Sequence, residues 1–223
     1  MPGFASNPIR TARALLAATA DRLPSAQESV RADVLILAVG PAGTDPREAI
    51  AEARRLAPLV YVRPRPLDNP SIESDLDFAV DGEADGVVLP GAFGAGAIQH
   101  LGAKLAVWEA EHGRADGRTR ILALIDDAAA ALALLTTRPP GGRLVGLIAR
   151  PPPDAPGRAA RLQAATLFAA DAWDVPAFVV EAEDLGPSRL AAARTRARRD
   201  GFAGLVTSDP GALAAIRAAF PPG

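Results

Sequence analysis

Short apolar runs recur along the chain, and each is followed by a turn and then by a longer segment rich in alanine and arginine. The runs are continuous rather than alternating, which is typical of strands in a parallel sheet that is covered on both faces. We therefore predict eight strands, which are ARALLA (12–17), DVLILAV (33–39), PLVYVR (58–63), GVVLP (86–90), RILALI (120–125), RLVGLI (143–148), AFVVE (177–181) and GLVTS (204–208).

The longer segments between these runs predict helices. Two of them begin with an Asp-Pro pair, Asp45-Pro46 and Asp209-Pro210, in which the carboxylate can cap the helix and the proline suits its first turn. Asn69-Pro70-Ser71 is a similar start. The eight predicted helices cover residues 23–32, 45–56, 70–80, 97–112, 128–135, 155–173, 187–199 and 210–220.

Strands that alternate with helices in this way predict an α/β fold, and eight such units predict a closed TIM (β/α)8 barrel. The 223 residues place the chain at the compact end of the size range of that fold. We therefore expect residues 1–223 to form a single barrel domain. An open, doubly wound sheet is the alternative.

The charge balance argues against some partners. The chain has 24 basic and 26 acidic residues, and its formal net charge of -2 gives no long-range field that would collect nucleic acid or an anionic membrane. No cysteine is present, so there is no thiolate nucleophile and no disulfide framework.

No apolar run approaches the roughly 20 residues that span a bilayer, and no export signal is visible at the start. We expect a cytoplasmic protein.

Candidate chemistry is expected at the carboxyl ends of the strands, where TIM barrels carry their active sites. Arg63 ends the third predicted strand, and its planar guanidinium can bind a carboxylate through two hydrogen bonds. The alternative for Arg63 is a salt bridge at the barrel rim. The fifth strand ends at Asp126 and Asp127, of which one can hold a hard cation and the other can cap the next helix. We favour Asp126 for the cation and Asp127 for the cap.

A glycine-rich loop, GAFGAGA, follows the fourth predicted strand. The backbone N–H groups around Gly91 and Gly94 could hold a phosphate. The loop lacks the G-x-G-x-x-G pattern of dinucleotide sites, so a flexible loop is the alternative.

His100 and His112 lie on one predicted helix more than three turns apart and cannot chelate one ion together.

Several segments in this order resemble the HpcH/HpaI aldolase and citrate lyase beta subunit family. They are LLAATADRLPSAQESVRADVLILAV, VYVRPRPLDNP, ADGVVLP, RILALID and GLVTSDPGALAAIRAAF. The resemblance implies a TIM barrel that makes or breaks carbon–carbon bonds in hydroxy acids or their acyl-CoA thioesters, with Mg²⁺ polarising a carbonyl. It also implies a homo-oligomer, often a trimer or hexamer.

The resemblance assigns roles to four residues. Arg63 matches the arginine that faces the substrate carboxylate or enolate oxygen, and Arg22, in TADRLP, resembles a second arginine of the site. Arg22 could instead cover the first helix. Asp126 stands where the family has a metal-binding glutamate, and Asp154 is the acid nearest to the expected second metal ligand. Aspartate is shorter by one methylene, which Mg²⁺ tolerates poorly because it demands a strict octahedron.

The departures from the family concern its charged residues. The acidic cluster expected after the second strand is replaced by Ala38-Val39-Gly40, and the lysine expected after VVLP is replaced by Gly91. Asp209-Pro210 stands where the family has His-Pro. Three hypotheses follow: a divergent lyase with a partly degraded Mg²⁺ site, a non-catalytic homologue that binds a small acid or acyl-CoA as a partner or regulator, and an enzyme of different chemistry on the same barrel.

Overall fold

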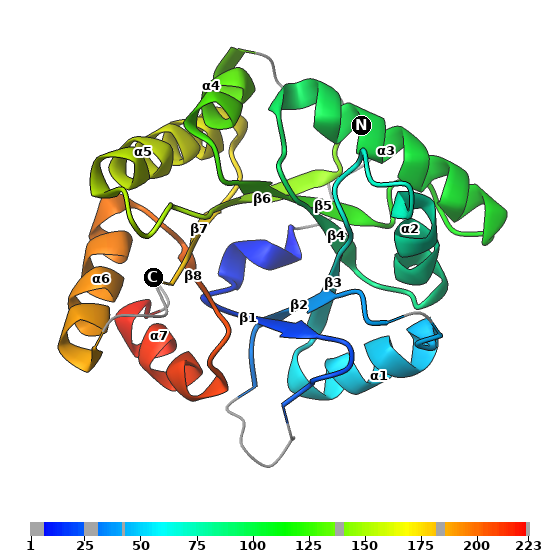
Figure 1. Cartoon of the computed structure of the whole chain (residues 1–223), viewed down its shortest axis with the longest axis horizontal. Coiled ribbons are helices and arrows are strands. Elements are labelled where there is room, and N and C mark those ends of the chain that lie inside the picture. The colour runs from blue at the N-terminus through cyan, green and yellow to red at the C-terminus, as the bar shows by residue number, and fades with distance from the viewer. Residues whose placement is uncertain (1–6, 25–30, 42, 137–140, 182–185, 222–223) are drawn as a thin grey trace.

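The computed structural model of the chain describes residues 7–24, 31–41, 43–136, 141–181 and 186–221. Its eight strands are parallel and form a closed barrel in chain order, because β1 pairs with β8 as well as with β2 (Figure 1). All eight predicted strands are confirmed to within two residues, and closure excludes the open sheet. They are β1 (Ala14–Thr19), β2 (Val34–Ala38), β3 (Leu59–Arg63), β4 (Gly86–Leu89), β5 (Arg120–Ile125), β6 (Leu144–Ala149), β7 (Ala177–Val180) and β8 (Gly204–Thr207).

Helices surround the barrel on its outside (Figure 1). The first predicted helix, 23–32, falls mostly on residues 25–30, which lie outside the described residues. None of the described helices is long and apolar enough to cross a bilayer. They are α1 (Pro46–Leu56), α2 (Ile72–Asp81), α3 (Gly94–Glu111), α4 (Ala128–Thr136), α5 (Pro156–Trp173), α6 (Pro187–Asp200) and α7 (Leu213–Ala219), with the 3₁₀ helices η1 (Pro8–Thr11) and η3 (Pro210–Ala212).

Aspartate caps fix where several helices begin. Asp45 accepts hydrogen bonds from the backbone N–H groups of Arg47 and Glu48 at 2.8 and 2.9 Å, as predicted for the start of α1. Asp127 accepts one from Ala129 at 2.5 Å, so the prediction that it caps the helix after β5 is confirmed. Asp209 also caps, but Pro210 opens the 3₁₀ helix η3 rather than an α-helix.

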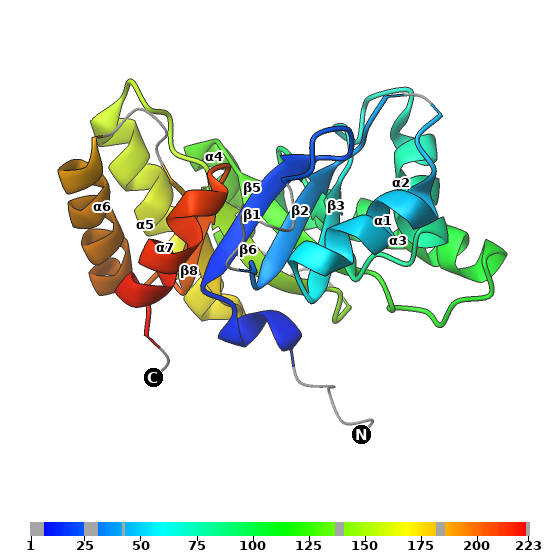
Figure 2. The same cartoon turned by 90° about the horizontal axis from the view of Figure 1, so that it is seen from below.

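The interior of the barrel is filled by side chains from alternating strand positions. Large residues such as Leu15, Tyr61, Leu122 and Phe178 form this interior cluster and are fully buried. Gly86 is required next to Tyr61, because a Cβ there would come within 2.4 Å of the tyrosine ring. The 3₁₀ helix η1 packs against the same cluster and closes the N-terminal end of the barrel (Figure 2).

Carboxylates and arginines pair at this N-terminal end. Asp85, which directly precedes β4, accepts a hydrogen bond from the backbone of Val60 and forms an ion pair with Arg54 at 2.9 Å. Glu109 of α3 is fully buried and binds both terminal nitrogens of Arg143 at 2.9 and 2.7 Å. These pairs tie the outer helices to the beginnings of the strands.

Candidate functional site

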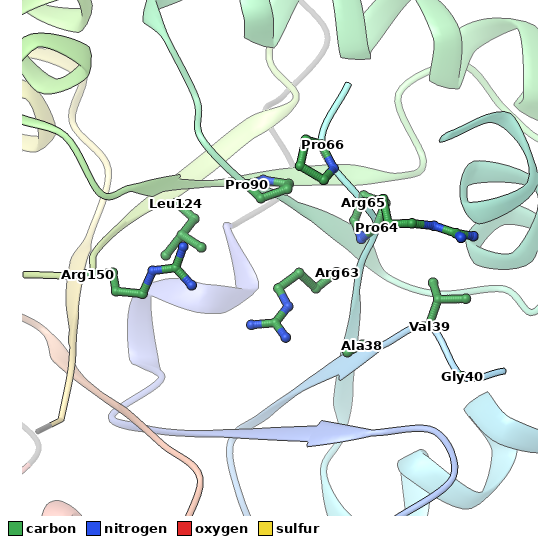
Figure 3. A pocket seen from close by; sticks show the side chains of 10 residues that line it. All are labelled: Ala38, Val39, Gly40, Arg63, Pro64, Arg65, Pro66, Pro90, Leu124 and Arg150. Atoms are coloured by element: carbon green, nitrogen blue, oxygen red, sulfur yellow. The ribbon is translucent and has the colours of Figure 1, made fainter. Parts of the chain in front are cut away.

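Two adjoining cavities of about 380 and 310 Å³ lie at the C-terminal mouth of the barrel. They share Arg63, Leu124 and Arg150, which Figure 3 shows among the residues that line the first cavity. The deeper cavity has largely apolar walls from the barrel interior, which include Ile36, Val88, Leu124, Ile148, Val180 and Val206. The hydroxyl-bearing residues Thr19, Thr207 and Ser208 lie along its β1 and β8 side.

The alternation of side chains along the strands places the charged residues at this mouth. Tyr61, Leu124 and Ile148 belong to the interior cluster of the barrel. Because side chains in a strand alternate between faces, the residues two positions later are directed to the same side. These are Arg63, Asp126 and Arg150, and Figure 3 shows the guanidinium groups of Arg63 and Arg150 extending toward the centre of the mouth from opposite sides.

Arg150 and Asp126 form an ion pair across β5 and β6. Ala149 lies beside Ile125 in the sheet register, and the N–H of Arg150 donates to the carbonyl of Ile125 at 2.8 Å. The next positions on these two strands are therefore neighbours, and Arg150 Nη2 lies 2.8 Å from Asp126 Oδ2. The predicted metal ligand is thus the counter-ion of an arginine.

Arg63 has a different neighbour. It lies beside Ala38 of β2 in the sheet register, so a methyl group stands where Arg150 has a carboxylate. Among the described residues, Arg63 has neither an ion pair nor a side-chain hydrogen bond. Burial lowers the pKa of the Arg63 guanidinium, and the positive charge of Arg150 lowers that pKa further. The mouth therefore carries a partly buried positive charge that has no acidic partner within the described part of the chain.

The loop that follows Arg63 is held in place by Asp75 of α2. Asp75 of α2 is fully buried and accepts hydrogen bonds from the Arg65 backbone N–H at 2.8 Å and from its Nε at 2.9 Å. Pro64 and Pro66 flank Arg65 and restrict the backbone further. The second arginine of the VRPRP segment is therefore structural, and it fixes the path of the chain that presents the first.

Asp126 lines neither cavity, although its partner Arg150 lines both, and the other predicted site residues also lie outside the two cavities. Arg22 has a side chain that is 87% exposed, and Asp21 is its ion-pair neighbour at 4.0 Å. Gly91 and Gly94 have positive φ angles of 59° and 71° and lead into α3, which has no side-chain cap on its first turn. Neither glycine lines the mouth. Their predicted role in phosphate binding stays a prediction.

The donor set does not fit Mg²⁺. Asp126 is engaged by Arg150, and Asp154, the second predicted ligand, is an exposed residue of the loop before α5. No group of three histidine, cysteine or acidic residues within the described part of the chain could hold a metal ion. Because Mg²⁺ requires oxygen ligands in a near-ideal octahedron, a single aspartate already paired with an arginine is a poor site for it.

Arg150 is the site residue that sequence reasoning missed. The prediction for the segment after β6 rests on Asp154 and gives no role to Arg150. The sequence signal that could have identified Arg150 is its position, because it follows the sixth apolar run as closely as Asp126 follows the fifth. In a barrel of parallel strands such positions face the same mouth.

No protein-family model matches the sequence, and no curated protein matches it. Several solved structures match the fold. RipC from Yersinia pestis has a TM-score of 0.72 at 21% sequence identity, over 96% of this chain and 97% of that one. A citrate lyase beta subunit from M. tuberculosis, complexed with oxaloacetate and magnesium, has a TM-score of 0.71 at 21% identity, over 96% and 99%.

A third match is Haloferax volcanii malate synthase in a complex with magnesium and glyoxylate, which has a TM-score of 0.76 at 18% identity, over 96% of this chain and 76% of that one. The likeness is one of fold. These sequence identities are low, and a shared TIM barrel by itself does not fix a reaction. The chemistry of this chain has to be inferred from its own mouth residues.

Proposed function

We propose that the protein binds a small carboxylic acid at the mouth of its barrel, with Arg63 holding the carboxylate. The observation that carries this proposal is the Arg63 guanidinium, which is partly buried, directed into the mouth and without an acidic partner among the described residues. A buried charge without a partner costs stability, and such groups are concentrated at functional sites. A bound carboxylate would supply the missing counter-charge through two hydrogen bonds.

The surroundings of Arg63 favour a small organic acid over an inorganic anion. Val88, Leu124 and Ile148 give the deeper cavity an apolar surface that can receive the carbon skeleton of the acid. Thr19, two positions after the interior residue Ala17, lies at the opposite wall and offers its hydroxyl to a polar substituent. Two of the structural neighbours carry oxaloacetate or glyoxylate, which are small acids, and this supports the same class for the chain.

Isothermal titration calorimetry with propionate tests this proposal. Arg63→Gln should weaken binding by about 10- to 100-fold, as expected for the loss of a charge-assisted pair. The affinity of Arg63→Lys should lie between those of the unaltered protein and Arg63→Gln, because the charge remains while the planar guanidinium is lost. Arg198→Gln, at the far end of α6, removes an exposed positive charge and is the matched control. Unchanged affinity in Arg63→Gln would show that Arg63 is structural.

Carbon–carbon lyase activity on a hydroxy acid or its acyl-CoA thioester is the second candidate function. It is supported by the resemblance to the HpcH/HpaI and citrate lyase beta subunit family and by the match to a citrate lyase beta subunit in fold. Such a reaction develops negative charge on an enolate oxygen, and Arg63 and Arg150 are placed to stabilise it. Since the donor set does not fit Mg²⁺, no step is assigned to a metal.

Incubation with hydroxyacyl-CoA thioesters separates the two candidates. A lyase releases a carbonyl compound and a shorter thioester, and Arg63→Gln should abolish that release. A binding protein retains the ligand without turnover. The glycine loop at Gly91 and Gly94 stays the predicted contact for a phosphate of coenzyme A, and the uncapped first turn of α3 is consistent with that role.

A further inference from the structure

The mouth contains a second arginine, Arg150, to which the proposed binding of a carboxylate by Arg63 gives no role. Arg150 lines both cavities together with Arg63, and each extends toward the centre from its own side of the barrel, β3 for Arg63 and β6 for Arg150 (Figure 3). Its side chain is 46% exposed, although it is paired with Asp126. A guanidinium has five N–H donors, and the ion pair with Asp126 engages Nη2, so donors remain for a ligand.

The two arginines at the mouth favour an anion that carries two carboxylates. Arg63 and Arg150 bring two guanidinium groups to the mouth, and the ion pair with Asp126 leaves other N–H donors of Arg150 open to a second carboxylate. The two guanidinium groups carry like charges and repel each other, and the charge of Arg150 accordingly lowers the pKa of Arg63. An acid with a carboxylate at each end would relieve that repulsion at both arginines, whereas a monocarboxylate can pair fully with one of them.

We propose that Arg150, oriented by Asp126, serves as the fixed cation of this site in place of a divalent metal, so that the mouth binds a small dicarboxylic acid between Arg63 and Arg150 without metal. This inference rests on the proposed function, because it adds a second contact to the acid held by Arg63. Asp126 is then a positioning residue. It holds the guanidinium through a hydrogen bond and partly neutralises its charge.

Asp126→Asn gives the sharpest test, because the two roles of Asp126 predict opposite signs. If Asp126 is a metal ligand, the amide lowers ligand affinity. If Asp126 is the counter-ion of Arg150, the amide removes a negative charge but keeps an acceptor oxygen for Nη2. Binding of a dicarboxylate should then become about threefold tighter or more, since a unit charge a few ångströms away has at least that effect even in water.

We would titrate the full chain with propionate, malonate and succinate at constant ionic strength, in EDTA and again with excess Mg²⁺. The better of the two dicarboxylates should bind about tenfold tighter than propionate, with equal affinity in EDTA and in Mg²⁺. Arg150→Gln should remove most of that advantage, and Arg150→Lys should restore part of it. Arg198→Gln is again the matched control. The EDTA comparison uses the unaltered protein and so does not depend on the folding of any variant.

The outcomes separate the two proposals. Dicarboxylate binding that requires Mg²⁺, or that weakens in Asp126→Asn, would overturn the role of Arg150 while leaving acid binding by Arg63 intact. Equal affinities for propionate and both dicarboxylates would also overturn it. If none of the three acids binds, or if Arg63→Gln has no effect on any of them, the proposed function itself is wrong.

Discussion

Arg143 at the N-terminal end of the barrel and Arg63 at the mouth are both partly buried, but their surroundings differ. Burial lowers the pKa of each guanidinium. The hydrogen bonds that Arg143 donates to Glu109, and the charges of Glu109 and Asp116, outweigh that effect and leave the pKa of Arg143 raised. Arg63 has Arg150 as its charged neighbour instead of a carboxylate, and its pKa stays lowered.

The difference distinguishes arginines that are paired within the protein from one that is open to a ligand at the mouth. The N-terminal end pairs its arginines with carboxylates that also hold backbone N–H groups, as Glu109 does for Gly117 and Thr119. At the mouth, Ala38 occupies the position beside Arg63, and no described residue pairs with this partly buried cation, which lowers stability. An arrangement that lowers stability at the catalytic face of a TIM barrel is best explained by a ligand that completes it.

Breaking the N-terminal pair should have the largest effect. Glu109→Ala leaves Arg143 without its main partner, and we expect the free energy of unfolding in urea to fall by about 3–5 kcal/mol. Glu73→Ala is the control, because Glu73 forms an exposed pair with Lys104 and should cost about 1 kcal/mol or less. Acid affinity should be unchanged in Glu109→Ala. Equal losses in the two variants would contradict a special role of the buried pair.

The same pair predicts how stability responds to acid. Burial alone would raise the pKa of Glu109, but hydrogen bonds from Arg143 and Thr119 leave it below the usual value. The stability contributed by Glu109 is therefore present above its unfolded pKa of about 4.3, and it is lost as the pH falls through the lowered folded value. Glu109→Ala should lack this part of the acid dependence.

Making the mouth resemble the N-terminal end should have the next largest effect. Ala38→Asp introduces a carboxylate beside Arg63, in the arrangement that already joins Asp126 to Arg150. The new aspartate should occupy the guanidinium and reduce the affinity for propionate at least about tenfold. Ala38→Asn, which adds a side chain of similar size without the charge, is the control. If both variants bind propionate as the unaltered protein does, Arg63 is not the group that holds the acid.

The smallest effect concerns Tyr61, which is buried between the two ends. Its hydroxyl has no hydrogen-bond partner among the described residues, and burial together with the charge of Asp85 raises its pKa. Tyr61→Phe should therefore raise the free energy of unfolding by about 1 kcal/mol near neutral pH. Above pH about 10 the unfolded chain ionises while the folded chain does not, so stability falls with rising pH, and the variant should lack that fall.

Tyr61 can be followed directly because it is the single tyrosine of the chain. Ultraviolet absorbance of tyrosinate, recorded with circular dichroism during an alkaline titration, should increase together with unfolding. Ionisation near pH 10 in a chain that is still folded would show that Tyr61 is accessible to solvent.

The fold could be predicted because each strand leaves a local signal. Runs such as DVLILAV and RILALI are apolar throughout, since both faces of the strand are buried between the interior and the outer helices. The cap formed by Asp127 was predictable for the same reason, because a cap depends on residues two or three positions away. Helix 23–32 and its boundaries stay a prediction.

The site could be predicted only in part. The mouth position of Arg63 follows from its place at the end of a strand, but its lack of a partner depends on its neighbour on β2, Ala38, which is 25 positions earlier in the chain. The role of Asp126 likewise depends on Arg150, which is brought beside it by the register of β5 and β6. Spacing along the chain does not reveal such cross-strand neighbours, so the ion pair of Asp126 with Arg150 could not be predicted from the sequence.

Closure of the N-terminal end by η1 determines the route by which ligands enter and leave the barrel. Ile9 and Ala12 pack into the N-terminal end of the interior, and Asn7 anchors the segment to the carbonyl of Val145 at 2.8 Å. The mouth is then both entrance and exit. A molecule bound deep against Ile36 and Val206 has to leave after any second molecule that sits above it, which imposes an order of release on a reaction with two products.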